Sequence, residues 1–124
     1  MTRLQLLILP ALLAPLALAA CKSAGAGAET RADITARMKT AEAPIQECYA
    51  AALKQNRRIK GRLSLRLTAE AGTGKFTNIS VLRDETNDPA VRKCVLDEVG
   101  KLKLEKPTKS AVQIDQPINF APNN

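Results

Sequence analysis

Three cysteines, Cys21, Cys48 and Cys94, are the residues of this chain with the most obvious capacity for chemistry. A catalytic cysteine acts as the thiolate and needs a base, which is most often a histidine, to remove its proton. The sequence contains no histidine. We therefore expect no enzyme, no cofactor, no metal site and no small-molecule substrate, and we expect acylation or disulfide formation as the chemistry of these thiols.

Cys21 ends an apolar segment that begins after Arg3 and is rich in leucine and alanine. Two small residues, Ala19 and Ala20, stand directly before it. A basic start, an apolar stretch and small residues at the cleavage point are typical of a secretory signal. The stretch resembles the lipobox of bacterial lipoproteins, in which the peptidase cuts before a cysteine that is then acylated. The resemblance implies that residues 1–20 are a cleaved signal peptide and that Cys21 carries the lipid, such as palmitate.

Two alternatives for this segment are an uncleaved membrane anchor and an ordinary secretory signal. The apolar run falls slightly short of the roughly 20 residues that span a bilayer, and Pro10 and Pro15 interrupt it. Lys22 follows the cysteine, where an aspartate would suggest retention at the inner membrane in enteric bacteria. We expect a lipid-anchored protein that faces the periplasm, at the outer membrane rather than the inner one.

If Cys21 is acylated, Cys48 and Cys94 remain as an even pair in an oxidising compartment. We predict a disulfide between them. It would close a loop of roughly 47 residues and stabilise the fold by about 4 kcal/mol in the chain-entropy description. The alternative is two buried free thiols on apolar helix faces.

The chain divides into a tether and one small domain. Residues 21–32 begin with small, flexible residues and predict a linker that carries the lipidated cysteine. Residues 33–124 hold the folding material. Because the chain has no tryptophan and its aromatic residues are Tyr49, Phe76 and Phe120, the core must consist mainly of leucine, isoleucine, valine and alanine.

Three helices are predicted. The first covers residues 30–40, and the second runs over residues 44–55 with Pro44 at its first position. The third starts at Asp88, a capping residue, with Pro89 in its first turn. The apolar stripes of the second and third helices are Ile45, Cys48, Tyr49, Ala52 and Leu53, and Val91, Cys94, Val95, Val99 and Leu102. Each stripe contains one cysteine, so the pairing is geometrically reasonable.

Three strands are also predicted. Apolar and polar residues alternate over residues 62–71, and residues 72–74 supply a turn into a returning strand. The alternation slips once at residues 77–78, which predicts a bulge. The closing strand over residues 112–120 contains Pro117, which places it at an edge of the sheet. The expected fold is α+β, in the order helix, strand, strand, helix, strand, with the helices on one face of a small antiparallel sheet.

Residues 45–120 resemble the C-terminal domain of the AgmX/PglI family, which is similar to the C-terminal domain of TonB. The residues that carry the resemblance are Ile45, Cys48, Tyr49, Gly61, Arg62, Leu63, Leu65, Gly74, Lys75, Phe76, Asn78, Ile79, Val81, Val91, Cys94, Val95, Val112, Ile114, Pro117, Ile118 and Phe120. Family members usually have an aromatic-proline stretch before the last strand, whereas this chain has Leu-Lys-Leu-Glu-Lys-Pro at residues 102–107.

The resemblance implies a periplasmic protein-interaction module with no enzymatic activity. TonB couples proton flux to outer-membrane receptors through a membrane anchor and a long spacer, which the short tether of this chain does not provide. The binding mode that remains is the addition of a strand from an envelope protein to the sheet edge. The expected partner-binding residues are Val112, Ile114, Ile118 and Phe120. The alternative is a terminal strand that binds nothing.

A second functional hypothesis comes from the formal net charge of +7. A group of basic residues could bind anionic cell-wall polymer or lipid headgroups. The group consists of Arg57, Arg58, Lys60, Arg62 and Arg66. A solvated strand face, or charge that keeps the domain soluble, explains these residues as well. Nucleic acid is not an expected partner, because the aromatic platforms that stack bases are missing.

Overall fold

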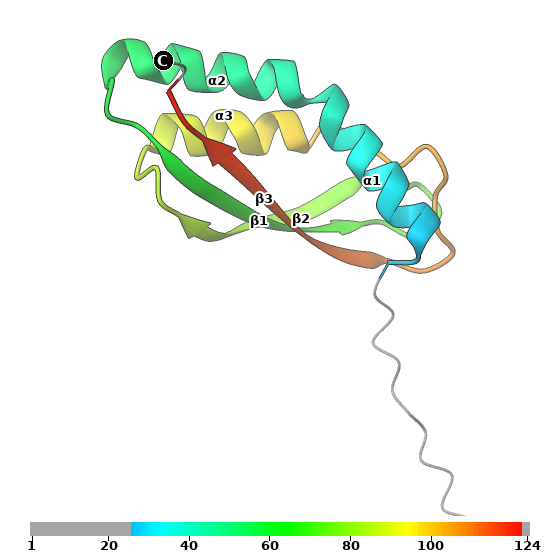
Figure 1. The fold of residues 1–124 in the computed structure, drawn as a ribbon. Coiled ribbons are helices and arrows are strands. Elements are labelled where there is room, and N and C mark those ends of the chain that lie inside the picture. The colour runs from blue at the N-terminus through cyan, green and yellow to red at the C-terminus, as the bar shows by residue number, and fades with distance from the viewer. Residues whose placement is uncertain (1–25, 123–124) are drawn as a thin grey trace, which may run out of the picture.

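The computed structural model describes residues 26–122, which fold into one helical layer on one three-stranded sheet (Figure 1). The elements are α1 (Ala28–Thr40), α2 (Glu42–Gln55), β1 (Gly61–Ala69), β2 (Phe76–Asp84), α3 (Pro89–Val99) and β3 (Val112–Phe120). Within these residues, no helix has the length and apolar character that a membrane span requires. The expected signal peptide and Cys21 lie outside the described residues.

The sheet has the order β2-β1-β3, and both strand pairs are antiparallel. Helices α2 and α3 run side by side over one face of this sheet (Figure 1). In the part of the chain that the structure describes, the opposite face carries no helix. The structure therefore confirms the expected α+β class, the order of the elements and the placement of the helices on one face.

Strand β1 lies at the centre of the sheet, and its side chains alternate strictly between the core and the open face. Leu63 and Leu65 are fully buried under the helices, and Leu67 is 1% exposed. Arg62 and Arg66 point to the other face. One unbroken period-two pattern thus specifies the register of the central strand.

Strand β2 contains the expected bulge. Its pairing with β1 shifts beside Asn78, which has a φ of 50°. Asparagine tolerates this left-handed conformation better than most residues. A second irregularity follows at Leu82, where Val81 pairs with Leu65 but Arg83 already pairs with Ser64. The sequence pattern did not indicate this second bulge, which leaves the Leu82 side chain 47% exposed.

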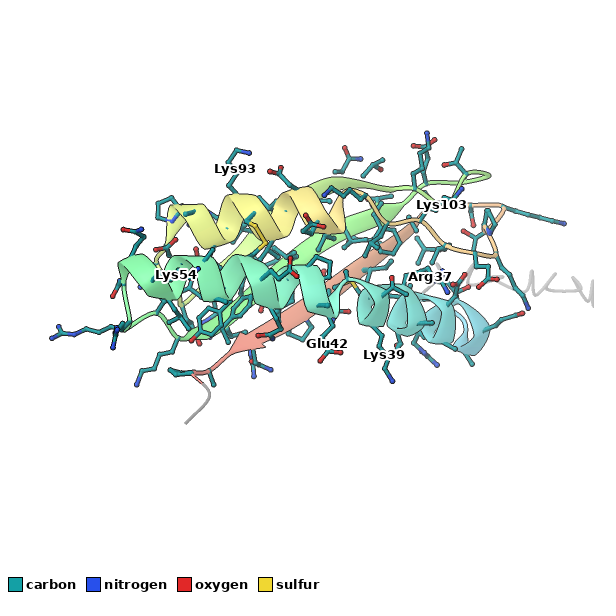
Figure 2. All side chains as sticks on the ribbon, turned by 90° about the horizontal axis from the view of Figure 1, so that it is seen from above. Arg37, Lys39, Glu42, Lys54, Lys93 and Lys103 are labelled. Carbon is teal, nitrogen blue, oxygen red and sulfur yellow. A yellow bond between two sulfur atoms is a disulfide. The ribbon has the colours of Figure 1, made fainter. Side chains whose placement is uncertain are left out.

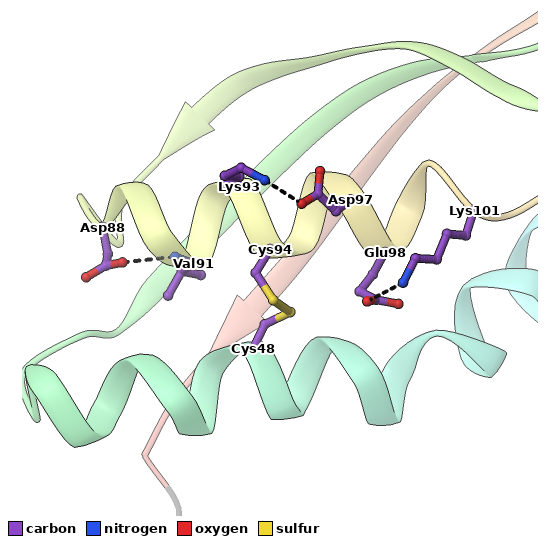
Figure 3. Close-up of a disulfide and its surroundings, with 8 residues drawn as sticks. All are labelled: Cys48, Asp88, Val91, Lys93, Cys94, Asp97, Glu98 and Lys101. Carbon is purple, nitrogen blue, oxygen red and sulfur yellow. Dashed lines mark hydrogen bonds and ion pairs between the residues drawn. A yellow bond between two sulfur atoms is a disulfide. The ribbon is translucent and has the colours of Figure 1, made fainter.

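A disulfide joins α2 to α3, as Figure 3 shows. The Cα atoms of Cys48 and Cys94 lie 5.7 Å apart, and the S–S bond is 2.04 Å long. The prediction of this pair is confirmed, and the alternative of two free thiols is excluded. Helix α3 starts as expected, since the Asp88 side chain accepts a hydrogen bond of 2.9 Å from the backbone N–H of Val91.

The first two helices start earlier in the chain than the sequence predicts. Helix α2 begins at Glu42 rather than Pro44, and the proline still lies in the first turn, where its missing N–H costs no helical hydrogen bond. Helix α1 begins at Ala28, so the last residues of the expected 21–32 tether are helical. Polar contacts explain this extension, because Glu29 forms an ion pair of 2.8 Å with Lys106.

Candidate partner-binding edge and basic loop

Strand β3 is the more regular of the two sheet edges. It pairs with β1 over nine consecutive residue pairs, from Gly61 with Phe120 to Ala69 with Val112, and the register never shifts. The other edge strand, β2, carries the two bulges described above. Bulges twist an edge and hinder the pairing of a further strand. The straight edge of β3 is therefore the one that geometry favours for strand addition.

The β2 edge is also covered at one end by the segment that leads into β3. The backbone N–H of Phe76 donates to the Leu102 carbonyl at 3.1 Å, and the N–H of Leu104 donates to the Gly74 carbonyl at 2.9 Å. Gly74 has a φ of 70°, and a Cβ atom there would lie 2.9 Å from that of Leu104. This close approach depends on the glycine.

The side chains expected to meet a partner lie in the domain's own core. Val112 and Ile114 are 8% exposed, Phe120 is 3% exposed, and Ile118 is partly buried against the same cluster. These side chains pack mainly under the helices, so only a small part of each can contact a partner. What β3 can offer is its backbone, together with the alternate side chains that the sequence analysis did not single out, such as Gln113.

The direction of the β3 backbone groups follows from β1. At Arg62 the backbone carbonyl accepts from the N–H of Glu85 at 2.9 Å, and the backbone N–H donates to a Glu85 carboxylate oxygen at 2.9 Å. The backbone N–H and C=O of Arg62 therefore point toward the β2 side of the strand. Backbone groups alternate in direction along a strand, and antiparallel pairs alternate between bonded and non-bonded. The backbone N–H and C=O groups of Leu63 and of every second residue after it therefore point toward β3. Their partners in β3 have even numbers.

The odd-numbered residues of β3 consequently direct their N–H and C=O groups away from the sheet. Pro117 is one of them, and the absence of its N–H leaves the pairing with β1 intact. The side-chain amide of Gln116 donates to the Pro117 carbonyl at 3.2 Å. The free edge therefore offers N–H donors at Gln113, Asp115 and Asn119.

A groove runs along this edge, between β3 on one side and α1 and α2 on the other. Its first part has a volume of about 330 Å³ and is lined by Ile34 and Arg31 of α1 and by residues 113–116 of β3. Its second part, of about 280 Å³, lies between Met38 of α1, the start of α2 and residues 116–119. Both parts include Gln116 and together follow most of the strand.

Two of the five predicted patch residues are engaged on the open face of the sheet. Arg66 donates two hydrogen bonds, each of 2.7 Å, to the carboxylate of Asp115 on the neighbouring strand. This contact holds the pKa of Asp115 below its usual value. Arg62 donates from Nε to the Asn119 side-chain oxygen at 3.2 Å. The strand face is therefore not the continuous positive stripe that the sequence suggested.

The other three predicted residues lie in the connection between α2 and β1, and Lys54 precedes them in the last turn of α2. We call Lys54, Arg57, Arg58 and Lys60 the basic loop. All four side chains are exposed. Lys54 is not among the predicted patch residues, although it stands three positions before Arg57 in the sequence.

The basic loop is held by a buried anchor. Ile59 is 2% exposed, and its carbonyl accepts a hydrogen bond of 2.6 Å from the Tyr49 hydroxyl. Burial raises the pKa of Tyr49, so this hydroxyl stays protonated as a donor. The N–H of Arg58 donates to the Asn56 side-chain oxygen at 3.0 Å. These contacts define the backbone of the loop.

Within residues 26–122, no cluster of histidine, cysteine, aspartate or glutamate has the arrangement of a metal site. The described surface offers backbone groups at the β3 edge and exposed cations at the basic loop.

Comparisons with known proteins give one structural similarity. No family model matches the sequence, and no curated protein matches it. The solution structure of the TonB C-terminal domain of Helicobacter pylori, residues 179–285, is similar to 82% of this chain and to 99% of its own length, with 22% sequence identity and a TM-score of 0.45.

Proposed function

We propose that this protein is a lipid-anchored envelope protein whose β3 edge binds an extended segment of a periplasm-facing partner protein. The observation that carries the proposal is the straight, unshifted edge of β3 beside a groove that follows most of the strand. A strand that pairs with such an edge gains main-chain hydrogen bonds, and pockets for alternate side chains give it specificity.

The groove indicates what such a segment would look like. Ile34 and Ile114 supply apolar surface to its first part, and Arg31 and Asp115 supply one charge of each sign. An incoming strand would place every second side chain on the helix side of the sheet. We infer that the partner presents an apolar residue opposite Ile34, with polar residues on the alternate positions.

Site-specific crosslinking in cells tests this docking mode. A photo-crosslinking residue at Gln113 or Asn119 should give adducts of the same mass, because both positions lie on the free edge of β3. Ser80 is the matched control, since it is an exposed position on the bulged edge strand β2. Equal adducts from Ser80, or none from the β3 positions, would contradict docking at this edge.

The lipid anchor needs a separate test, because its support comes from the sequence alone. Cells that express the full chain are labelled with a tagged palmitate, and the chain is then isolated from membrane fractions separated by density. We expect the chain without substitutions to carry the label and to be enriched in the outer-membrane fraction. We expect no label in Cys21→Ser. The control Ser23→Ala should keep the label. Label that persists in Cys21→Ser would refute acylation at this residue.

A further inference from the structure

The basic loop concentrates positive charge without a neutralising carboxylate. Lys54, Arg57, Arg58 and Lys60 fall within seven residues, and none of them forms an ion pair within 4.0 Å in the described part of the chain. Seven other lysine and arginine side chains of the domain do form an ion pair. The paired lysines and arginines are Arg37, Arg66, Arg83, Arg92, Lys93, Lys101 and Lys106.

The acidic residues at the end of β2 and in the turn that follows, where Glu85 lies against Gly61, are occupied by other groups. Asp84 forms an ion pair of 2.6 Å with Arg92. Glu85 binds Arg83 at 2.8 Å through one carboxylate oxygen and accepts from the N–H of Arg62 through the other. These contacts leave the charges of the basic loop open to an external anion.

The helix macrodipole explains only a small part of this charge. A cation near the C-terminus of a helix is stabilised by the partial negative charge there, but the effect fades beyond the last turn. Lys54 lies in the last turn of α2, whereas Arg57, Arg58 and Lys60 follow the end of the helix. The macrodipole therefore does not account for three of the four charges.

The loop is ordered before any ligand arrives. The Tyr49 hydroxyl and the Asn56 side chain bind its backbone, and the buried Ile59 stands between Arg58 and Lys60. A binding surface with a preformed backbone loses less conformational entropy when it binds. Because its backbone is preformed, the basic loop can present its four cations to successive anionic groups of one charged polymer.

The basic loop and the start of α1 lie at opposite ends of the domain (Figure 1). Figure 2 shows Lys54 at one end of α2, with Arg37 and Lys103 toward the other end of the molecule. The nine residues of β1 separate the two ends by roughly 27 Å, at the rise of an antiparallel strand. If Cys21 carries the lipid, six residues separate it from α1, which begins at the end of the domain opposite the basic loop.

We propose that the basic loop binds a linear polyanion, a flexible polymer with closely spaced phosphate or carboxylate groups. That the natural polyanion is a polymer of the cell envelope rests on the proposed location of the protein. The binding of a polyanion by the basic loop does not depend on that location. Recognition is by charge rather than stacking, because Tyr49, Phe76 and Phe120, the aromatic residues of the chain, are each 3% exposed. A bilayer of anionic lipid is the competing ligand that the test must exclude.

The test measures binding of the purified full chain to labelled sodium polyphosphate and to polyglutamate, at about 50 mM and about 200 mM salt, a range over which contacts with fixed anions weaken strongly. In the test variant, Lys54, Arg57, Arg58 and Lys60 are all changed to glutamine. We expect its affinity to fall on the order of 100-fold, because each cation beside an anionic surface contributes severalfold.

A matched control removes the same net charge elsewhere. Arg31, Lys75, Lys103 and Lys109 are exposed, form no ion pair within residues 26–122 and lie toward the other end of the domain. The control variant changes these four residues to glutamine and should keep most of the affinity. Thermal unfolding of both variants checks that each is folded, and Arg57→Gln with Arg58→Gln replaces the test variant if it is not.

The outcomes separate the possibilities. Loss of binding in the basic-loop variant but not in the control supports the proposal. Equal loss in both variants overturns it, because binding would then reflect net charge alone. Binding to vesicles of phosphatidylglycerol and phosphatidylcholine without binding to either polymer also overturns it, as does the absence of any binding. The assay uses purified protein, so an error in the proposed location or in β3 docking leaves it interpretable.

Discussion

The Tyr49 hydroxyl donates a buried hydrogen bond of 2.6 Å to the carbonyl oxygen of Ile59, and this bond ties α2 to the basic loop. The Tyr49 ring also packs against Phe120, with 4.9 Å between ring centroids. Phe120 is the last residue of β3 and pairs with Gly61 at the start of β1. One aromatic pair therefore supports both candidate surfaces, the basic loop and the end of the β3 edge.

Tyr49→Phe should destabilise the domain by about 1–3 kcal/mol, because the buried Ile59 carbonyl loses its donor while the ring contact with Phe120 remains. Hydrogen exchange at Lys60 should speed up as the loop loosens. Thr40→Val is a suitable control, since it removes a hydroxyl-to-carbonyl bond of the same 2.6 Å length that lies exposed. Equal effects of the two changes in urea unfolding would contradict the role given to burial.

The Cys48–Cys94 disulfide should supply much of the stability of this small domain. Its sequence separation is 46 residues, for which the chain-entropy description gives about 4 kcal/mol. The variant with both cysteines changed to alanine should unfold at a correspondingly lower denaturant concentration. A reductant should shift the unfolding midpoint of the natural chain and leave that of the variant unchanged. A natural chain that is insensitive to reductant would show that the crosslink contributes little.

Asp84 should make stability depend on acid pH. Burial alone would raise its pKa, but hydrogen bonds from Thr86, Asn87 and Arg92 outweigh burial and lower it. A carboxyl whose pKa is lower in the folded state stabilises that state above its unfolded pKa, and the contribution is lost as pH falls through the folded pKa. The free energy of unfolding should therefore decrease below about pH 4.

The variant Asp84→Asn isolates this contribution. It should cost about 1–3 kcal/mol at neutral pH, since it weakens several partly buried hydrogen bonds, and it should reduce the acid dependence of the unfolding free energy. Asp97→Asn is the control, because it removes an exposed ion pair with Lys93 on α3 and should change stability little. An unaltered acid profile in Asp84→Asn would refute this assignment.

The assigned direction of the β3 backbone predicts opposite outcomes for proline at adjacent positions. Gln113→Pro removes an outward N–H and should leave the domain folded, as Pro117 already does. Ile114→Pro removes an N–H that faces Leu67 of β1 and should disrupt the sheet. Ile114→Ala measures the side-chain part of that loss, about 2–5 kcal/mol. Greater damage from Gln113→Pro than from Ile114→Pro, in thermal unfolding, would reverse the assignment.

The order of the elements could be predicted from the sequence because each element carries a local signal. The alternation of leucines specified β1, and the Asp88-Pro89 pair specified the start of α3. The bulge at Leu82 escaped prediction, because the single exposed leucine there fits an ordinary alternation equally well. The early start of α1 escaped as well, since its stabilising partner Lys106 lies 77 residues away.

For the candidate sites, too, some features could be predicted from the sequence and others depend on the tertiary structure. Charge and cysteine positions are properties of the chain, so the sequence alone determined the excess of basic residues and predicted the edge position of the proline-containing strand. It also predicted the Cys48–Cys94 pair, although two free thiols stayed open as the alternative until the structure showed the disulfide. Only the tertiary structure decided which basic residues stay open to a ligand, because Asp115 meets Arg66 through strand pairing between residues 49 positions apart. It also decided that β3 offers its backbone rather than its apolar side chains, since only the packed helices show which face is buried.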